Sequence, residues 1–187
     1  MFNLPNQVTL ARLALIPLLV IVFYLPWEWH YFASAVIFSV AALTDLLDGY
    51  LARRLNLATP FGAFLDPVAD KLIVVVALVL LLEKHESAAF TVPSMVIIGR
   101  EIVVSALREW MAELGKRASI AVSYIGKIKT TLQMIAIIVL LMFNPDTVPY
   151  FDTFGLALLY VAAGLTLWSM TIYLKIAWPE FHKRDSR

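Results

Sequence analysis

Six long apolar segments constrain this chain more than any other feature of its sequence. Each is close to the roughly 20 residues that an α-helix needs to cross the hydrocarbon core of a membrane. The segments are residues 8–24, 31–55, 61–82, 91–114, 120–143 and 151–177. Hydrophobic residues make up 61% of the 187 positions, whereas a typical soluble domain is about half apolar. The sequence therefore predicts a polytopic membrane protein.

The apolar runs are continuous rather than alternating, which favours helices over the strands of a closed barrel. Basic residues predict the orientation, because cytoplasmic loops carry an excess of Lys and Arg. Lys84 is the only such residue after the first, third and fifth segments. The other side collects Arg12, Arg53, Arg54, Lys116, Arg117, Lys127, Lys183, Arg184 and Arg187. We expect an all-α membrane domain over residues 1–187, with six transmembrane helices and both termini in the cytoplasm.

Composition also argues against several function classes. A net charge of +1 does not fit a nucleic-acid-binding protein, and the absence of cysteine excludes disulfides, zinc–thiolate sites and thiol nucleophiles. The histidines, His30, His85 and His182, are scattered and lack the surrounding groups of a catalytic or metal site. No basic region precedes the first apolar run, so we expect a retained membrane helix rather than a signal peptide.

Four aspartates lie in the stretch DLLDGYLARRLNLATPFGAFLDPVAD, which joins the second and third segments. Asp45 and Asp48 are three residues apart, and Asp66 and Asp70 are four apart, so each pair shares a helix face. Because one short connection separates the two faces, we expect them to converge. Clustered carboxylates repel one another unless cations intervene, and hard oxygen ligands suit magnesium, manganese or calcium. Two divalent ions would balance four carboxylates and clamp a diphosphate.

Plainer interpretations of this stretch stay open. The aspartates could form structural ion pairs with basic neighbours such as Arg53 and Lys71, although ionisable residues in membrane helices are functional by default. Small residues at positions 49, 52 and 62 leave the backbone accessible to a bulky ligand. They would equally allow close packing between helices.

The pattern Asp45-x-x-Asp48-Gly49-x-x-Ala52-Arg53, eight residues, Gly62-x-x-x-Asp66-x-x-x-Asp70 resembles the signature of the CDP-alcohol phosphatidyltransferases at every fixed position and spacing. The stretches PNQVTLAR, GREIVVSALREWMAELGKR and GKIKTTLQM resemble members of that family that use sn-glycerol 3-phosphate. The resemblance covers nearly the whole chain and is weakest after Asn144. A gapped match of this length is far more specific than a lone DxxD.

This resemblance implies a six-helix enzyme of the bacterial inner membrane, usually homodimeric, with an active site open to the cytoplasm. It implies transfer of the phosphatidyl group from CDP-diacylglycerol to sn-glycerol 3-phosphate, with release of CMP and with two divalent cations, Mg²⁺ or Mn²⁺. By the same resemblance, the metals are held by Asp45, Asp48, Asp66 and Asp70, and Asp70 is also the candidate base. The CDP site would include Gly49, Ala52, Arg53, Gly62, Asn6 and Thr9.

Basic residues in the fourth and fifth segments point to the acceptor. Arg100 and Arg108 lie eight residues apart, two turns along one face, where lone arginines would be costly in a membrane. Lys127 and Lys129 enter the fifth segment from the cytoplasmic side. Together these cations suit a phosphate dianion, whereas a neutral acceptor would not need them. Lys129 could equally be solvated or contact anionic lipid.

The alternative for the arginines is pairing with the acidic residues Glu101, Glu109 and Glu113. Glu101 is adjacent to Arg100, and helical neighbours point in different directions, so we expect Glu101 to point elsewhere.

Other functions compete with this one. A family member with another acceptor, such as a cardiolipin synthase or an inositol-phosphate-using synthase, is the nearest alternative. Membrane prenyltransferases also hold diphosphates with aspartates, but their motifs would lie farther apart in the chain. A divalent-cation transporter would place its ligands near the bilayer midplane, often within repeated halves.

Overall fold

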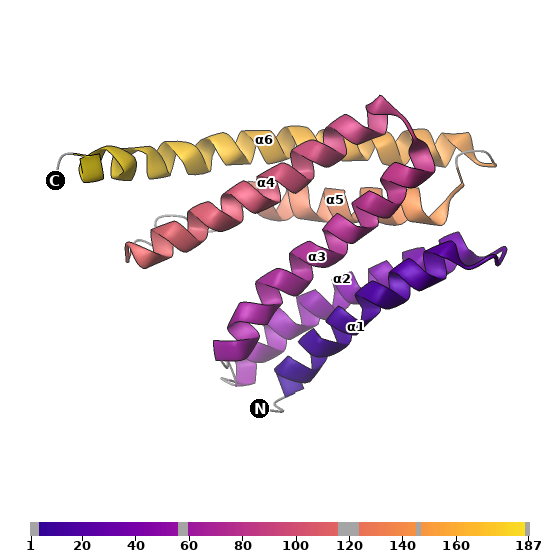
Figure 1. The fold of residues 1–187 in the computed structure, drawn as a ribbon, viewed down its shortest axis with the longest axis horizontal. Coiled ribbons are helices and arrows are strands. Elements are labelled where there is room, and N and C mark those ends of the chain that lie inside the picture. The colour runs from indigo at the N-terminus through magenta and orange to yellow at the C-terminus, as the bar shows by residue number, and fades with distance from the viewer. Residues whose placement is uncertain (1–3, 56–59, 116–123, 145–146, 186–187) are drawn as a thin grey trace. The chain divides into compact units, whose positions relative to one another are not determined.

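The computed structural model describes residues 4–55, 60–115, 124–144 and 147–185. Within these ranges it describes only the backbone of residues 4–6, 45–55, 60–64, 66, 124–127 and 179–185. The described residues form six α-helices and no strand (Figure 1). They are α1 Leu4–Tyr24, α2 His30–Leu55, α3 Pro60–His85, α4 Ala88–Glu113, α5 Tyr124–Met142 and α6 Pro149–Asp185. The predicted all-α class is confirmed, and each predicted apolar segment corresponds to one helix.

Local sequence signals explain several helix boundaries. α3 begins at Pro60, whose fixed φ angle suits the first helical position. Ser87 caps α4, because its side chain accepts a hydrogen bond of 3.3 Å from the amide of Phe90. After α4, Gly115 has a φ angle of +71°, and its amide donates to the carbonyl of Ala112. Glycine adopts this conformation without a Cβ clash, so the helix ends there.

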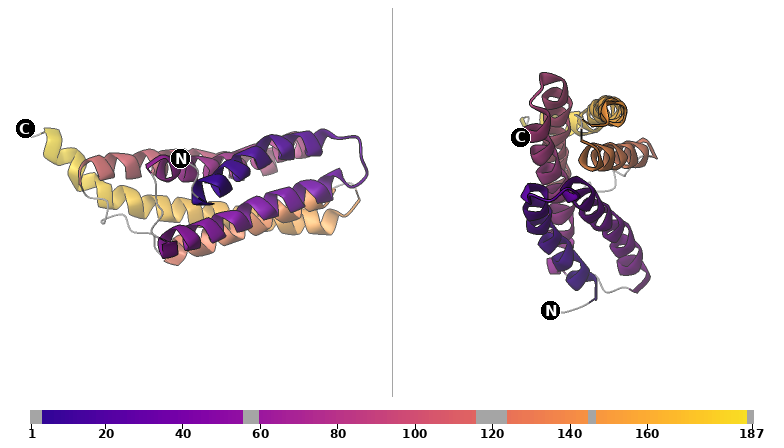
Figure 2. Two further views of the ribbon diagram at one scale, coloured as in Figure 1. Left: turned by 90° about the horizontal axis from the view of Figure 1, so that it is seen from below. Right: turned by 90° about the vertical axis from the view of Figure 1, so that its right-hand side faces the viewer.

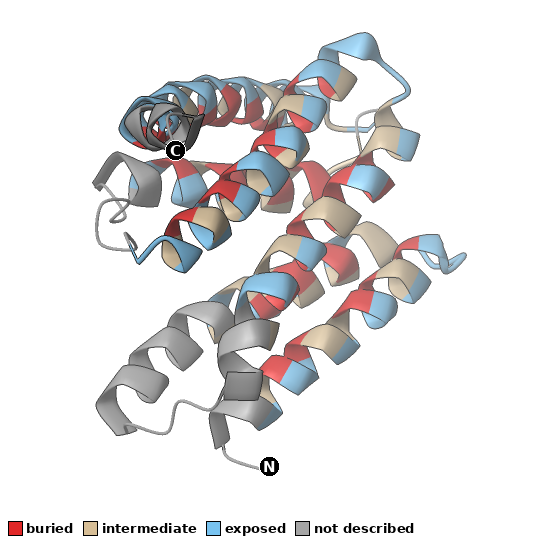
Figure 3. Cartoon of the chain, turned by 60° about the vertical axis from the view of Figure 1, so that its left-hand side comes forward, coloured by how far each residue is buried: buried red, intermediate tan, exposed pale blue. Residues whose placement is uncertain are grey.

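Within the described ranges, three helices are long and apolar enough to cross a membrane: Gln7–Tyr24, Ala88–Glu113 and Pro149–Trp178. Shorter apolar helices among the described residues are His30–Thr44 and Ile128–Met142. Buried and exposed residues alternate along each helix (Figure 3), and many of the exposed ones are large and apolar. Met95 and Trp168, for example, are 66% and 65% exposed. Such surfaces are unfavourable in water and suit contact with lipid, so the chain is a membrane protein.

The chain divides into two compact units. The first comprises Met1–Glu86 and Ala136–Gly155, and the second comprises Ser87–Ile135 and Leu156–Arg187. In the first unit α1 packs against both α2 and α3, and α2 also contacts α3. α1 runs into the short connection at residues 25–29, and α2 returns from it (Figure 2). In the second unit, side-chain hydrogen bonds join α4 to both α5 and α6.

Polar contacts bring several helix ends of the first unit together. Tyr24, the last residue of α1, donates a hydrogen bond to Glu83 near the end of α3. The ammonium of Lys84 donates to the carbonyls of Leu140 and Phe143 at the end of α5, over 2.9 and 2.7 Å. These carbonyls belong to the turn where a helix lacks its own donors, and a cation there is favoured by the helix dipole. The ends of α1, α3 and α5 therefore lie together.

The start of α6 joins the same group of helix ends. His85 Nε2 lies 2.6 Å from Asp152 Oδ1, and His85 Nδ1 lies 2.9 Å from the carbonyl oxygen of Leu81. At the connection from α1 to α2, His30 Nδ1 lies 2.7 Å from the carbonyl oxygen of Phe23. In this group α1, α3 and α5 end, and α2 and α6 begin, as expected for consecutive antiparallel helices.

Gly155 allows α6 to approach α5 in the first unit. A methyl group there would come within 2.8 Å of Leu140 Cγ and 3.2 Å of Val139 Cγ1, whereas one at Gly164 would meet nothing within 4 Å. We expect Gly155→Ala to destabilise the protein by about 1–2 kcal/mol, because Leu140 is fully buried. Gly164→Ala is the control and should be neutral or stabilising, since alanine favours helix by about 1 kcal/mol. Thermal unfolding in detergent measures both, and equal midpoints would contradict the packing argument.

Candidate active site

The four predicted metal-ligating aspartates lie on α2 and α3 of the first unit. Asp45 is ten residues before the end of α2, and Asp70 is ten residues after the start of α3, or about 15 Å along each helix. Asp48 and Asp66 are seven and six residues from the same ends, or about 10 Å. Because α2 contacts α3, the backbone sets Asp45 level with Asp70, and Asp48 level with Asp66.

The same aspartates are distant from the group of helix ends that Lys84 joins. They lie 15 to 19 residues from His30 on α2 or from His85 on α3, which corresponds to about 22–28 Å along a helix. The hydrocarbon core of a bilayer is about 30 Å thick. The backbone positions of the aspartates are therefore separated from the Lys84 end of these helices by a distance close to the thickness of that core.

Asp70 is the one predicted metal ligand with a described side chain. It is half-buried and interacts with another group of the chain. The other predicted ligands and most of the predicted CDP-site side chains are outside the described set: Asp45, Asp48, Asp66, Gly49, Ala52, Arg53, Gly62 and Asn6. Among the described side chains there is no group of three or more potential metal ligands. The donor set nevertheless fits hard divalent cations, because it consists of carboxylates without sulfur or imidazole.

α1 contributes a buried polar face to the first unit. Thr9 is 2% exposed and Arg12 is 1% exposed, and both interact with other groups of the chain. Sequence reasoning used Arg12 only as an indicator of orientation. Its spacing of three residues from Thr9, which places both on one face, was the signal that could have marked it. A buried guanidinium thus lies in the helix that contacts both aspartate-bearing helices.

A second polar cluster lies in the second unit, where α4 meets α5 and α6. Arg100 of α4 is buried, with Nη1 2.5 Å from Glu101 Oε1, and its Nη2 donates to Ser169 Oγ of α6 over 3.3 Å. Lys129 of α5 is also buried, and its Nζ lies 3.5 Å from the same oxygen of Glu101. One carboxylate oxygen is therefore shared by a guanidinium and an ammonium group.

The position of Glu101 corrects the expectation that it points away from Arg100. Adjacent helical side chains leave the backbone roughly 100° apart, but a long guanidinium side chain can bend back toward its neighbour. Arg100 is therefore paired with Glu101, which is the alternative that the sequence analysis left open for the arginines. Lys129 is likewise buried and paired rather than solvated. Arg100 Nε still has no hydrogen-bond partner among the described residues.

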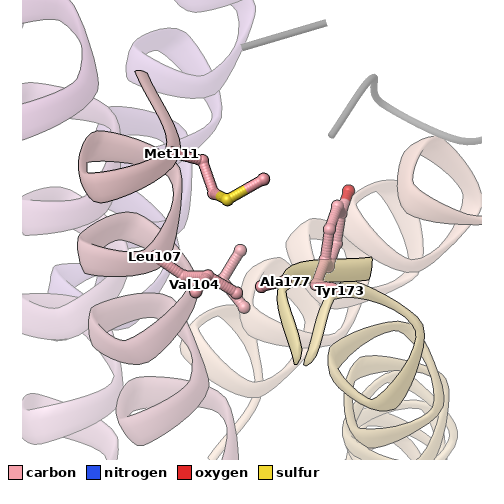
Figure 4. Packing of buried hydrophobic residues seen from close by; sticks show 5 residues of the cluster. All are labelled: Val104, Leu107, Met111, Tyr173 and Ala177. Carbon is pink, nitrogen blue, oxygen red and sulfur yellow. The ribbon is translucent and has the colours of Figure 1, made fainter. Parts of the chain in front are cut away.

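Arg108 reaches the same face of α6. Its Nη2 donates to the hydroxyl of Tyr173 over 3.1 Å. The guanidinium carbons of Arg108 and Arg100 lie 5.3 and 6.0 Å from the centre of the Tyr173 ring. The ring packs in an apolar cluster with Val104, Leu107, Met111 and Ala177 (Figure 4). Two arginines that begin two turns apart on α4 therefore converge on one aromatic ring.

The charge of this cluster determines which ligand it suits. Arg100, Arg108 and Lys129 supply three positive charges and Glu101 one negative charge, which leaves a formal net charge of +2. Lys127 lies in α5, and its side chain is outside the described residues. A phosphate monoester dianion complements this charge, and guanidinium groups match its oxygens in pairs of hydrogen bonds.

The sequence matches one known protein family over most of its length. The family model for CDP-alcohol phosphatidyltransferases matches residues 2–168. The chain belongs to the CDP-alcohol phosphatidyltransferase family. The matched range includes all four aspartates and, in the second cluster, Arg100, Glu101, Arg108 and Lys129. Members of this family generally depend on divalent metal ions.

Relatives within this family cover nearly the whole chain. A protein of Pseudomonas fluorescens is 55% identical over 186 residues, which are 99% of this chain and 94% of the relative. Proteins of Escherichia coli (strain K12) and Shigella flexneri are each 57% identical over 176 residues, which are 94% of this chain and 95% of the relative. All three are named CDP-diacylglycerol–glycerol-3-phosphate 3-phosphatidyltransferase.

Proposed function

We propose that this chain transfers the phosphatidyl group of CDP-diacylglycerol to sn-glycerol 3-phosphate, which gives phosphatidylglycerol phosphate and CMP. The observation that carries the acceptor assignment is the cation cluster of the second unit, with its net charge of +2. A neutral alcohol such as free inositol or serine would not require that charge. The names of relatives at 55–57% identity support both the donor and the acceptor.

The aspartates of α2 and α3 bind the donor in this proposal. Asp45, Asp48, Asp66 and Asp70 would hold two divalent cations, Mg²⁺ or Mn²⁺. When bound, such ions neutralise charge on the diphosphate and on the departing CMP. The CDP group would lie against Gly49, Ala52, Arg53, Gly62, Asn6 and Thr9. The small residues among these leave room for the nucleotide beside the helix backbone.

The reaction itself is a displacement at phosphorus. The free primary hydroxyl of the acceptor gives its proton to Asp70 while its oxygen forms a bond to the phosphorus that bears diacylglycerol. The bond from that phosphorus to the CMP oxygen breaks, and CMP leaves with the electron pair. The acceptor's phosphate is bound by Arg100, Arg108, Lys127 and Lys129. This binding restricts the orientations of the hydroxyl and so raises its effective concentration at the phosphorus.

We also propose six membrane spans in one membrane domain over residues 1–187, with both termini and the aspartates at the cytoplasmic side of a bacterial inner membrane. The ends of α1, α3 and α5 lie together beside Lys84, the one basic residue of the corresponding separators. That distribution supports this orientation, because most other basic residues belong to the opposite side. The family resemblance supports a homodimer.

Purified protein in detergent tests the proposal directly. CDP-diacylglycerol and radiolabelled sn-glycerol 3-phosphate are supplied with Mg²⁺ or with EDTA, and lipid-phase label and CMP are measured. We expect Mg²⁺-dependent labelling with one CMP released per acceptor. Free glycerol, inositol phosphate and phosphatidylglycerol serve as parallel acceptors. CMP release only with one of these would overturn the acceptor assignment, and no release from folded protein would overturn the transfer reaction.

A further inference from the structure

We infer that Tyr173 is a positioning residue for the acceptor and holds the two arginines of α4 where they bind one phosphate. The inference rests on the proposed function, because it deepens the role given there to Arg100 and Arg108. Tyr173 lies beyond residues 2–168, the range that the family model matches. What points to Tyr173 is its contact with both guanidinium groups.

The two arginines need a residue that holds their side chains together, because their backbone positions on α4 are far apart. Eight residues separate them, which is about 12 Å along a helix. Long arginine side chains have many rotamers, so binding one phosphate with both requires that their freedom be restricted beforehand. In the structure both guanidinium carbons lie within 6.0 Å of the Tyr173 ring centre. A cation over an aromatic face is attracted to the ring, so this arrangement restricts both side chains.

The ring is itself well fixed. Tyr173 is 5% exposed and packs against Val104 and Leu107, which lie on α4 between the two arginines, and against Met111 one turn farther on (Figure 4). Ser169, one turn earlier on α6, accepts a hydrogen bond from Arg100 and donates one to the carbonyl of Thr166. Ser169 and Tyr173 thus lie on one face of α6, where Ser169 accepts a hydrogen bond from Arg100 and the Tyr173 hydroxyl accepts one from Arg108.

The hydrogen bonds leave donors for a ligand. A guanidinium group has five N–H donors in a planar fork. Arg108 donates one of them to the Tyr173 hydroxyl. This hydrogen bond fixes the orientation of the Arg108 guanidinium group. Its remaining N–H groups can then donate pairs of hydrogen bonds to phosphate oxygens.

Two substitutions separate positioning from packing. Tyr173→Phe keeps the ring but removes the acceptor for Arg108, and Tyr173→Leu removes the ring as well. Tyr160→Phe, an exposed tyrosine of the same helix, is the matched control. We expect the KM for sn-glycerol 3-phosphate to rise about three- to tenfold in Tyr173→Phe, the effect of losing one ordinary hydrogen bond, and further in Tyr173→Leu. The kcat, the KM for CDP-diacylglycerol and CMP affinity should stay within about twofold in Tyr173→Phe.

The Arg108→Gln variant, measured in the same assay, distinguishes failure of the Tyr173 inference from failure of the proposed acceptor role of the cluster. If it raises the KM for sn-glycerol 3-phosphate and Tyr173→Phe does not, the inference is overturned while the proposed function stands. If Arg108→Gln leaves this KM unchanged, the acceptor role of the cluster fails, and the inference fails with it. If both raise the KM, the double variant should be no worse than Arg108→Gln alone, because the hydroxyl acts through that arginine. Additive effects would contradict positioning, and Tyr173→Phe keeps the test valid even if Tyr173→Leu does not fold.

Discussion

An Asp70→Asn enzyme is expected to lose at least about 100-fold in kcat, the lower range for removal of a general base. The amide keeps the size of the carboxylate and its place in α3, but it cannot accept the proton of the acceptor hydroxyl. The KM values for both substrates should change much less than kcat, because the cation cluster and the other three aspartates are intact. Initial rates of CMP release at saturating substrates measure this effect.

Asp66→Asn is the matched control, since Asp66 is proposed as a metal ligand without a role in proton transfer. Its loss should appear mainly as a higher Mg²⁺ requirement, by about 10- to 100-fold, and high Mg²⁺ should restore most of the rate. Asp70→Asn should stay slow at every Mg²⁺ concentration. Full recovery of Asp70→Asn at high Mg²⁺ would assign this residue to metal binding alone.

Much of the architecture could be predicted from sequence because lipid leaves few alternatives. A segment that crosses a membrane must satisfy its backbone internally, so long apolar runs of this kind predict helices. The short connection between α2 and α3 then places Asp45 level with Asp70 by residue counting alone. Periodicity within a helix and the length of a turn were sufficient to predict these backbone positions, whereas the metal site itself stays a prediction.

Contacts between distant helices were not predictable in the same way. Glu101 meets Lys129 of α5, and Arg100 meets Ser169 of α6, so these pairings depend on the register between helices. In a membrane protein the lipid-facing side of a helix is as apolar as the buried side, so periodicity does not reveal which face is buried. Leu159, fully buried, and Val161, 52% exposed, illustrate this on α6. Tyr173 was therefore missed, because its sequence neighbours do not distinguish it from a lipid-facing aromatic.

Replacing Arg100 by glutamine should raise the KM for sn-glycerol 3-phosphate by about 30- to 150-fold, which corresponds to about 2–3 kcal/mol. Arg100 is buried, and its Nε has no hydrogen-bond partner among the described residues, so a phosphate oxygen would gain a desolvated donor there. The substitution also changes the net charge of the cluster from +2 to +1. Initial rates against acceptor concentration, at saturating CDP-diacylglycerol, measure the change.

Lys175→Gln is the control for Arg100→Gln, because it removes one positive charge from an exposed position on α6. It should leave the KM for sn-glycerol 3-phosphate unchanged, which would show that the effect of Arg100 is local. In both variants the KM for CDP-diacylglycerol should be normal, because the donor is assigned to the aspartates. An Arg100→Gln enzyme with an unchanged KM for sn-glycerol 3-phosphate would mean that the ion pair with Glu101 is structural, which is the alternative that the sequence leaves open. A large increase in this KM would instead mean that Glu101 holds the guanidinium ready for an incoming phosphate.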